Sequence, residues 1–361
     1  MSDLILKTQP EKICVIRLSA IGDTCHALAV VRRIQDNWPS ASITWIIGKT
    51  EAQLMANISD IEFIIFDKSK GWGAYKDIRN KLGGETFDIA LCMHSSMRVN
   101  FLYPIIRTPI RLGFDRKRAK DFQWLFTSRR IEATHGEHVL EAMMSFASAI
   151  GATPKPIRWD IPLGNDEREF STNFQSPNKP LVVISPCSSN RSRNFRNWSV
   201  ENYAKTIEHL NRKKCRVILT GGTSDLEIEY GAALSKNAMA ENLVGKTSLK
   251  QLAALIAAAD LLICPDSGPA HMATAFSTPV LGLYATSNPE RTGPLTSREL
   301  TVNRYPDAAQ KYLGKPVEQL HWGQRIRHPD AMALITAKEV MGKIDAFFDL
   351  ESSVAGYDIH K

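Results

Sequence analysis

Short apolar runs alternate with longer amphipathic stretches along this chain, and this alternation constrains the fold more than any other feature. Buried strands that alternate with helices are typical of parallel sheets covered by helices on both faces. The apolar runs predict strands at 13–17, 43–47, 63–66, 87–92, 110–113, 181–185, 215–220, 242–244, 260–264, 279–284 and 300–302. The amphipathic stretches predict helices at 24–37, 74–82, 137–150, 199–211, 225–236, 248–259 and 268–276.

The two sets of strands predict two Rossmann-like α/β domains in series. A chain of 361 residues is too long for one ordinary core and fits two domains. Periodicity fades in the polar, proline-bearing region from Thr153 to Pro180, which places the domains at 1–165 and 166–340. A long final helix is predicted from Ala337 to Asp349, and we expect the segment 341–361 to pack back on the N-terminal domain.

Composition restricts the class of protein. With 43% hydrophobic and 23% charged residues, the chain is typical of a globular protein, and no apolar run approaches the ~18–20 residues of a membrane-spanning helix. The first residues are too short and too acidic for a secretory signal, so we expect a cytoplasmic protein. Six scattered cysteines without a C-x-x-C pair favour reduced, buried thiols over disulfides or a zinc site. The net charge of +7 suits an anionic partner.

Polar loops follow several strands of the second half. Ligands of open α/β sheets bind beyond the carboxyl ends of the strands, so these loops are the candidate binding elements. The loop from Ser185 to Trp198 combines hydroxyls with arginines, which suits an anion, although a solvated loop is the simpler alternative. Ser267 and Gly268 expose backbone N–H groups at a helix start, and His271 follows one turn later. A structural histidine bonded to a carbonyl is the alternative for His271.

An aspartate lies directly behind a glycine where the first strand leads into a helix. In the stretch Arg17–Leu28, Asp23 follows Gly22 at this junction. The simplest role for such a residue is to cap the helix by accepting hydrogen bonds from its first free N–H groups.

Three motifs give the chain a resemblance to a known family. They are Arg17–His26, Ser185–Ser189 with Asn197-Trp198, and Asp266–His271. Over residues 12–345, the sequence resembles the heptosyltransferases, the glycosyltransferases that add heptose to the inner core of lipopolysaccharide. The resemblance implies a GT-B fold, in which an acceptor domain and a nucleotide-sugar domain face each other across a cleft. It also implies inverting transfer from ADP-heptose as donor substrate, without a metal ion or another cofactor.

The resemblance also implies roles for individual residues. Asp23 matches the general base, and the small turn formed by Ser19, Ala20 and Gly22 leaves room for a sugar beside it, with capping as a second role. His26 orients the acceptor or the carboxylate, or else packs in the core. The donor-binding positions are Ser188 and Ser189 at the phosphates, Arg196 in place of a lysine, Glu227 at the ribose, and Asp266, Ser267, Gly268 and His271 at the nucleotide.

The loop from Asn190 to Arg196 looks longer than the family's usual form. For this reason the arginine that binds the diphosphate is left open among Arg191, Arg193 and Arg196.

Basic residues are concentrated between positions 98 and 120. They predict an anionic acceptor. This fits what the resemblance implies, namely phosphorylated Kdo–lipid A as acceptor and peripheral contact with the cytoplasmic face of the inner membrane. The candidate acceptor-binding residues are Arg98, Arg116, Arg118 and Lys120, with a solvated charged face as the alternative. We expect Trp72, Tyr75 and Trp124 to lie along the same surface, in contact with lipid or sugar.

Three other functions compete with this interpretation. A nicotinamide-dependent oxidoreductase would also use paired Rossmann-like domains, but no G-x-G-x-x-G follows any predicted strand. A nucleic-acid-binding protein would explain the charge, but the sequence carries no recognition motif for it. A transferase that uses another nucleotide sugar is the nearest alternative.

Overall fold

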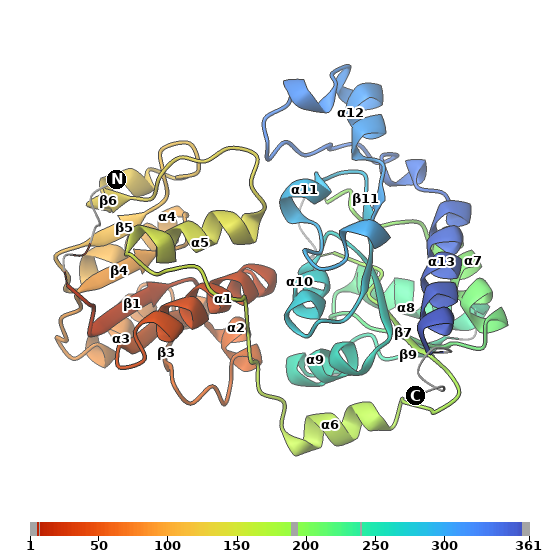
Figure 1. Ribbon diagram of the computed structural model, residues 1–361, viewed down its shortest axis with the longest axis horizontal. Helices are drawn as coiled ribbons and strands as arrows, with labels where there is room; N and C mark the ends of the chain where they lie inside the picture. The colour runs from red at the N-terminus through yellow and green to blue at the C-terminus, as the bar shows by residue number, and fades with distance from the viewer. Residues whose placement is uncertain (1–5, 7, 189–193, 239, 356–361) are drawn as a thin grey trace. The chain divides into compact units, whose positions relative to one another are not determined.

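The computed structural model describes residues 6, 8–188, 194–238 and 240–355. The chain forms two compact units that follow one another in the sequence, Met1–Pro162 and Leu163–Lys361 (Figure 1).

The first unit is built on a parallel sheet of six strands in the order β3-β2-β1-β4-β5-β6. The strands are β1 (Lys12–Ile16), β2 (Ser42–Gly48), β3 (Glu62–Phe66), β4 (Ile89–Cys92), β5 (Arg111–Gly113) and β6 (Arg129–Arg130). The helices are α1 (Ile21–Asn37), α2 (Lys49–Leu54), α3 (Gly73–Lys81), α4 (Met97–Asn100) and α5 (Val139–Ala149), with 3₁₀ turns at Lys68–Lys70, Tyr103–Ile105 and Gln123–Leu125. In the register of the central strands, Ile13 lies beside both Ile43 and Ile89.

The second unit repeats this plan with the order β12-β11-β10-β7-β8-β9. Its strands are β7 (Leu181–Ile184), β8 (Arg216–Leu219), β9 (Glu241–Asn242), β10 (Leu261–Pro265), β11 (Val280–Tyr284) and β12 (Val302–Asn303). Its helices are α6 (Asn165–Thr172), α7 (Val200–Arg212), α8 (Asp225–Ala238), α9 (Leu249–Ala258), α10 (Gly268–Ala275), α11 (Pro289–Thr292), α12 (Tyr305–Leu313) and α13 (Ala337–Ala355). Its 3₁₀ turns are Arg298–Leu300, Val317–Gln319 and Met332–Leu334.

Because the central strands are buried, they form apolar runs from which the sequence predicted them. Every residue of β4, β7, β10 and β11 is buried, because helices cover both faces of each sheet. The six cysteines are also buried, and none is in a disulfide. No helix in the described part of the chain is long and apolar enough to cross a membrane.

Some elements differ from the sequence prediction. Helix α1 begins at Ile21, before the predicted start at residue 24, and α6 lies inside the region expected to be a linker, where it packs on α9. Helix α13 packs against α7, beside which it lies in Figure 1, and its Val340 and Ile344 join the core of the second unit. These are contacts within its own unit, so the expected packing on the N-terminal domain stays a prediction.

The strand order identifies where each unit is built to bind. In both sheets the chain first winds outward in one direction and then returns to wind in the other. The reversal falls between β1 and β4 in the first unit and between β7 and β10 in the second. The loops beyond the carboxyl ends of these strand pairs diverge and leave room for a ligand.

Candidate functional site

Asp23 lies at the reversal point of the first sheet, in the first turn of α1. Its Oδ2 accepts a hydrogen bond from the Ala20 backbone N–H at 3.2 Å, and Ala20 is the residue that precedes the helix. The expected capping role is therefore present, although Asp23 is the third residue of the helix rather than the residue before it. About a third of the side chain stays exposed (35%), so the carboxylate is open to a ligand.

Arg17 holds the Asp23 carboxylate in place. Its Nη2 lies 2.5 Å from Asp23 Oδ2, and its Nη1 donates to the Met93 carbonyl at 2.6 Å. Met93 follows β4, so the guanidinium spans the reversal point from β1 to β4. The Arg17 side chain is only 11% exposed, and this burial strengthens the ion pair relative to one in water.

His94 completes this cluster as a neutral side chain. The Leu18 backbone N–H donates to His94 Nδ1 at 3.3 Å, so the ring proton resides on Nε2. Burial and the neighbouring Arg17 charge lower the pKa of His94 to about 3, against a weaker opposing effect of Asp23. Sequence analysis included Arg17 in a motif without giving it a role, and it missed His94, because the contact of His94 with Leu18 joins segments far apart in the chain.

His26 lies deeper in α1, three residues beyond Asp23. Its side chain is buried, and its ring meets that of His138 edge to face with centroids 5.9 Å apart. His138 precedes α5 and accepts the Leu140 N–H at 3.2 Å. This location in the contact between α1 and α5 favours the core alternative for His26.

The predicted acceptor residues divide into two groups. Arg98, Arg116 and Lys120 are exposed on segments that follow the carboxyl ends of β4 and β5. Arg118 is half-buried: it pairs with Asp115 and donates to the Glu132 carbonyl at 2.7 Å. This pairing favours a structural role for Arg118, whereas the other three remain available to an anion.

The loop after β7 brings Ser188 and Arg196 to the reversal point of the second sheet. Ser188 Oγ lies 2.7 Å from Asn194 Nδ2, and the Ser188 N–H donates to Asn197 Oδ1 at 2.9 Å. Arg196 Nη1 donates to the Asp266 carbonyl at 2.8 Å, which links this loop to the end of β10. Three of the predicted positions, Ser189, Arg191 and Arg193, lie outside the described residues.

Asp266 fixes the loop after β10. Its carboxylate is buried, with Oδ2 at 3.5 Å from Arg196 Nη1 and 3.7 Å from Arg325 Nη2. Two guanidinium groups around one carboxylate leave a net positive charge beside the start of α10, where an anion would be favoured. Arg325 was not identified from the sequence, because it comes from a loop distant along the chain.

Helix α10 begins at Gly268, with Ser267 in extended conformation before it. The Ser267 side chain makes no capping bond to the helix and lies beside the Cys264 thiol, whose pKa burial raises to about 12. The backbone N–H groups of the first turn therefore lack the usual side-chain cap. His271 is half-buried one turn into the helix, as the sequence predicted.

Glu227 lies in the first turn of α8, where its carboxylate accepts two hydrogen bonds from the preceding turn. Its Oε1 accepts the Gly222 N–H at 2.7 Å, and its Oε2 accepts the Ser224 hydroxyl at 2.6 Å. These bonds fix the glycine turn after β8 and leave lone pairs on both oxygens for a ligand hydroxyl.

Ser287 lies in the loop after β11, one of the polar loops that follow strands of the second half, although the sequence assigned it no role of its own. Its Oγ is buried and has no hydrogen-bond partner among the described residues. A buried hydroxyl without a partner is costly, which makes a ligand at this carboxyl edge a reasonable partner.

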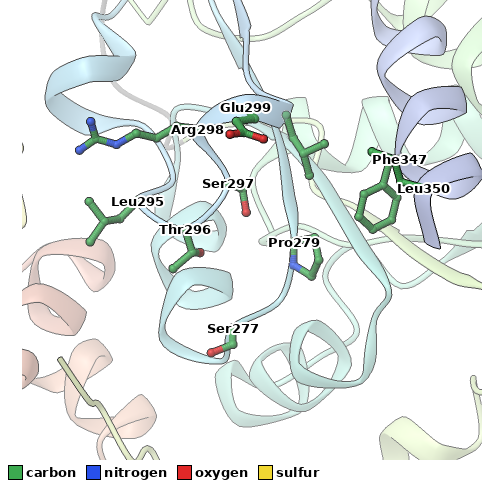
Figure 2. Close-up of a pocket in the computed structure, with 10 residues that line it drawn as sticks. Ser277, Pro279, Leu295, Thr296, Ser297, Arg298, Glu299, Phe347 and Leu350 are labelled. Atoms are coloured by element: carbon green, nitrogen blue, oxygen red, sulfur yellow. The ribbon is translucent and has the colours of Figure 1, made fainter. Parts of the chain in front are cut away.

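A separate pocket of about 890 Å³ lies elsewhere in the second unit. Figure 2 shows it between Phe347 and Leu350 of α13 and the segment 295–299, with Pro279 on its wall. Pro279 directly precedes β11, so this pocket lies toward the amino ends of the strands, the edge opposite the candidate donor loops. We therefore do not assign it to the nucleotide.

No group of three or more metal-ligating side chains is found among the residues that the structure describes.

Comparison with known proteins identifies the family. Residues 76–330 match glycosyltransferase family 9 (heptosyltransferase). The lipopolysaccharide core heptosyltransferase OpsX of Haemophilus influenzae is 37% identical over 337 residues, which are 93% of this chain and 96% of that protein.

The chain belongs to glycosyltransferase family 9, the heptosyltransferases.

Solved structures confirm the predicted fold of this glycosyltransferase. A family 9 glycosyltransferase from Veillonella parvula has a TM-score of 0.75 at 20% identity and covers 93% of this chain and 97% of its own. Escherichia coli heptosyltransferase WaaC with ADP has a TM-score of 0.71 at 18% identity, with 93% and 99% covered. The two parallel six-stranded units are thus those of a GT-B fold.

Proposed function

We propose that this heptosyltransferase moves heptose from ADP-heptose to the Kdo/heptose inner core of lipopolysaccharide, with inversion and without a metal ion. Family membership and the 37% identical lipopolysaccharide core enzyme support the transfer of heptose to the core. The solved relative with ADP supports the adenine nucleotide. The observation that carries the mechanism is the exposed Asp23 carboxylate held by Arg17 at the reversal point of the first sheet.

In this mechanism Asp23 is the general base. It takes the proton from the acceptor hydroxyl, whose oxygen forms a bond to the anomeric carbon of heptose. The bond from that carbon to the diphosphate oxygen breaks on the opposite face, and ADP leaves. Arg17 orients the carboxylate through the 2.5 Å contact and stays charged throughout.

The second unit stabilises the leaving diphosphate. Ser188, Arg196 and the uncapped start of α10 lie at one edge of the sheet, and each offers a donor that is fixed before reaction. Ser189 and His271 are assigned to the same site, with Glu227 at the ribose. Asp266 acts on the nucleotide through Arg196 and the position of Ser267.

The acceptor is anionic and lipid-linked in this proposal. Arg98, Arg116 and Lys120 are exposed cations on segments at the same sheet edge as Asp23, which suits a phosphorylated Kdo–lipid A. The protein would act from the cytoplasmic face, in peripheral contact with the inner membrane.

Substituting Asp23 by both Asn and Ala separates catalysis from capping. Asn keeps an oxygen that accepts the Ala20 N–H but is no base, so we expect Asp23→Asn to fold normally and to lose about 10²- to 10⁴-fold in transfer rate, as Asp23→Ala does. Affinity for ADP should change little. Product formation from ADP-heptose and a truncated core acceptor measures the rate, and calorimetry measures ADP binding.

Asp166→Asn is the matched control. Asp166 is an exposed aspartate in the first turn of α6 and is remote from both sets of site residues along the chain. Its substitution should leave transfer unchanged. Near-normal turnover of a folded Asp23→Asn protein would show that Asp23 only caps the helix.

The alternative donor is another nucleotide sugar, acting on a different anionic glycan. Direct calorimetry of ADP against UDP decides between the two. We expect tighter binding of ADP, and equal or tighter binding of UDP would overturn the donor assignment while leaving the fold and the role of Asp23 in place.

A further inference from the structure

Three loop segments of the first unit carry large apolar side chains into solvent. They are residues 68–75 after β3, 97–101 after β4 and 120–126 after β5. Because these strands are parallel, their carboxyl ends share one edge of the sheet, the edge at which Asp23 follows β1. The exposed apolar residues, called the aromatic surface below, are Trp72, Met97, Phe101, Phe122, Trp124 and Leu125.

Contacts between aromatic rings join the three segments into one surface. The Trp72 ring lies 5.3 Å from Tyr75 and 6.0 Å from Phe101, and Phe101 lies 5.8 Å from Phe126 of the third segment, measured between centroids. Yet 76% of Trp72 remains exposed, so these contacts arrange the rings without burying them.

Hydrogen bonds fix the third segment against the second. Asn100 Nδ2 donates to the Asp121 carbonyl at 2.6 Å, and the Met97 N–H donates to Asp121 Oδ2 at 3.1 Å. Phe122 follows with a left-handed backbone (φ +59°), and it and Leu125 are 58% and 63% exposed. The apolar side chains are thus presented by an ordered loop.

Positive charge surrounds this surface. Lys68, Lys76, Arg98 and Lys120 are exposed on or beside the three segments, and no ion pair is seen for them among the described residues. The neighbouring acids are engaged: Asp77 pairs with Lys70, and Asp121 accepts the Met97 N–H. Exposed aromatic residues flanked by unpaired cations match the interface of an anionic bilayer, where rings enter the headgroup region and cations meet lipid phosphates.

We propose that the aromatic surface docks the first unit on an anionic lipid bilayer. This inference rests on the proposed function, because a membrane-anchored acceptor would then be met by the same sheet edge that carries Asp23. The bilayer itself is the partner, and the acceptor lipid is not required for docking.

Vesicle flotation without donor or acceptor tests this proposal on the full chain. The probe is phosphatidylethanolamine vesicles with or without phosphatidylglycerol. We expect binding to the anionic vesicles, reduced about tenfold or more by Trp72→Ala and about fivefold or more by Lys68→Glu or Lys76→Glu. Added salt should weaken the binding.

Matched controls come from the second unit. Trp322→Ala removes a tryptophan that is 37% exposed, and Lys315→Glu reverses an exposed lysine; both should bind vesicles like the unmodified chain. Unchanged hydrogen-exchange protection of the peptides that cover β1 and α1 shows that the first unit of Trp72→Ala is folded.

Absence of vesicle binding, equal binding to neutral vesicles, or equal binding by Trp72→Ala and the unmodified chain would each overturn the docking surface. Because no substrate is present, none of these results bears on heptosyl transfer. Failure of transfer from ADP-heptose with intact vesicle binding would instead overturn the proposed function.

Discussion

Because His94 is neutral beside Asp23, the stability of the first unit should fall in acid, and His94→Asn should remove this effect. His94 is held neutral because its Nδ1 accepts the Leu18 N–H and because burial and Arg17 oppose a second proton. In His94→Asn, the amide oxygen can accept the same N–H but does not titrate. The variant therefore isolates the titration from the hydrogen bond.

The magnitude follows from the two pKa values of the histidine. The pKa of His94 is about 3 in the folded protein and 6.5 in the unfolded chain, so the unfolded chain takes up the proton first as pH falls. Stability is unaffected by this group above about pH 6.5 and is lost progressively between pH 6.5 and 3. From pH 7.5 to pH 5, the loss assigned to His94 is on the order of 2 kcal/mol.

Hydrogen exchange of the full chain measures this loss in the first unit alone. The readout is the protection factor of peptides that cover β1 and α1, which corrects for the intrinsic pH dependence of exchange. We expect protection in the unmodified chain to fall about thirtyfold more than in His94→Asn between pH 7.5 and pH 5. Loss of ring packing will lower the stability of His94→Asn at both pH values. The test is therefore the change in protection between pH 7.5 and pH 5, compared between the variant and the unmodified chain.

His321→Asn serves as the control, because it removes an exposed imidazole from the second unit. If His94→Asn loses protection with falling pH as steeply as the unmodified chain, then His94 is not the group that links acid to the stability of this unit, and its assigned neutrality is wrong.

Other predictions concern the donor site. Arg196→Gln should weaken ADP binding in calorimetry by about ten- to hundredfold, because it removes a charged donor; an unchanged Kd would exclude Arg196 as the diphosphate ligand. His271→Ala should weaken ADP more than Arg98→Ala does, whereas Arg98→Ala should raise the KM for the acceptor; the reverse pattern would exchange their roles. Ser287→Ala should raise the Tm of the free protein and weaken ADP, since it removes a buried unpaired hydroxyl, and an unchanged ADP affinity would leave Ser287 outside the site. Transfer activity should survive EDTA, and a strict requirement for added Mg²⁺ or Mn²⁺ would contradict the metal-free mechanism.

The two-sheet architecture was predictable because each buried strand appears in the sequence as a short run of apolar residues. Helices cover both faces of each sheet, so β4, β7, β10 and β11 read as continuous apolar runs in the sequence. The weaker elements left no such signal: β6 consists of two exposed arginines, and α6 is a short, polar helix in a region that resembled a linker.

The positions of the site loops were also predictable. Parallel strands place their carboxyl ends at one edge, so Asp23, Ser188 and Ser267 were expected beyond strand ends, and they lie there in the structure.

The partners of these residues were decided by the tertiary structure. Arg17 meets Met93 because β1 and β4 are neighbours, and Arg196 meets Asp266 because β7 and β10 are neighbours. Arg118 looked like its exposed neighbours in sequence, yet in the structure it donates to the Glu132 carbonyl of a later segment and is half-buried. The periodicity of apolar residues predicts which face of a strand or helix a residue lies on, because this pattern depends only on residues a few positions away. The contacts that orient a carboxylate or neutralise a histidine join strands far apart in the chain, so they exist only once the order of the strands in the sheet is set.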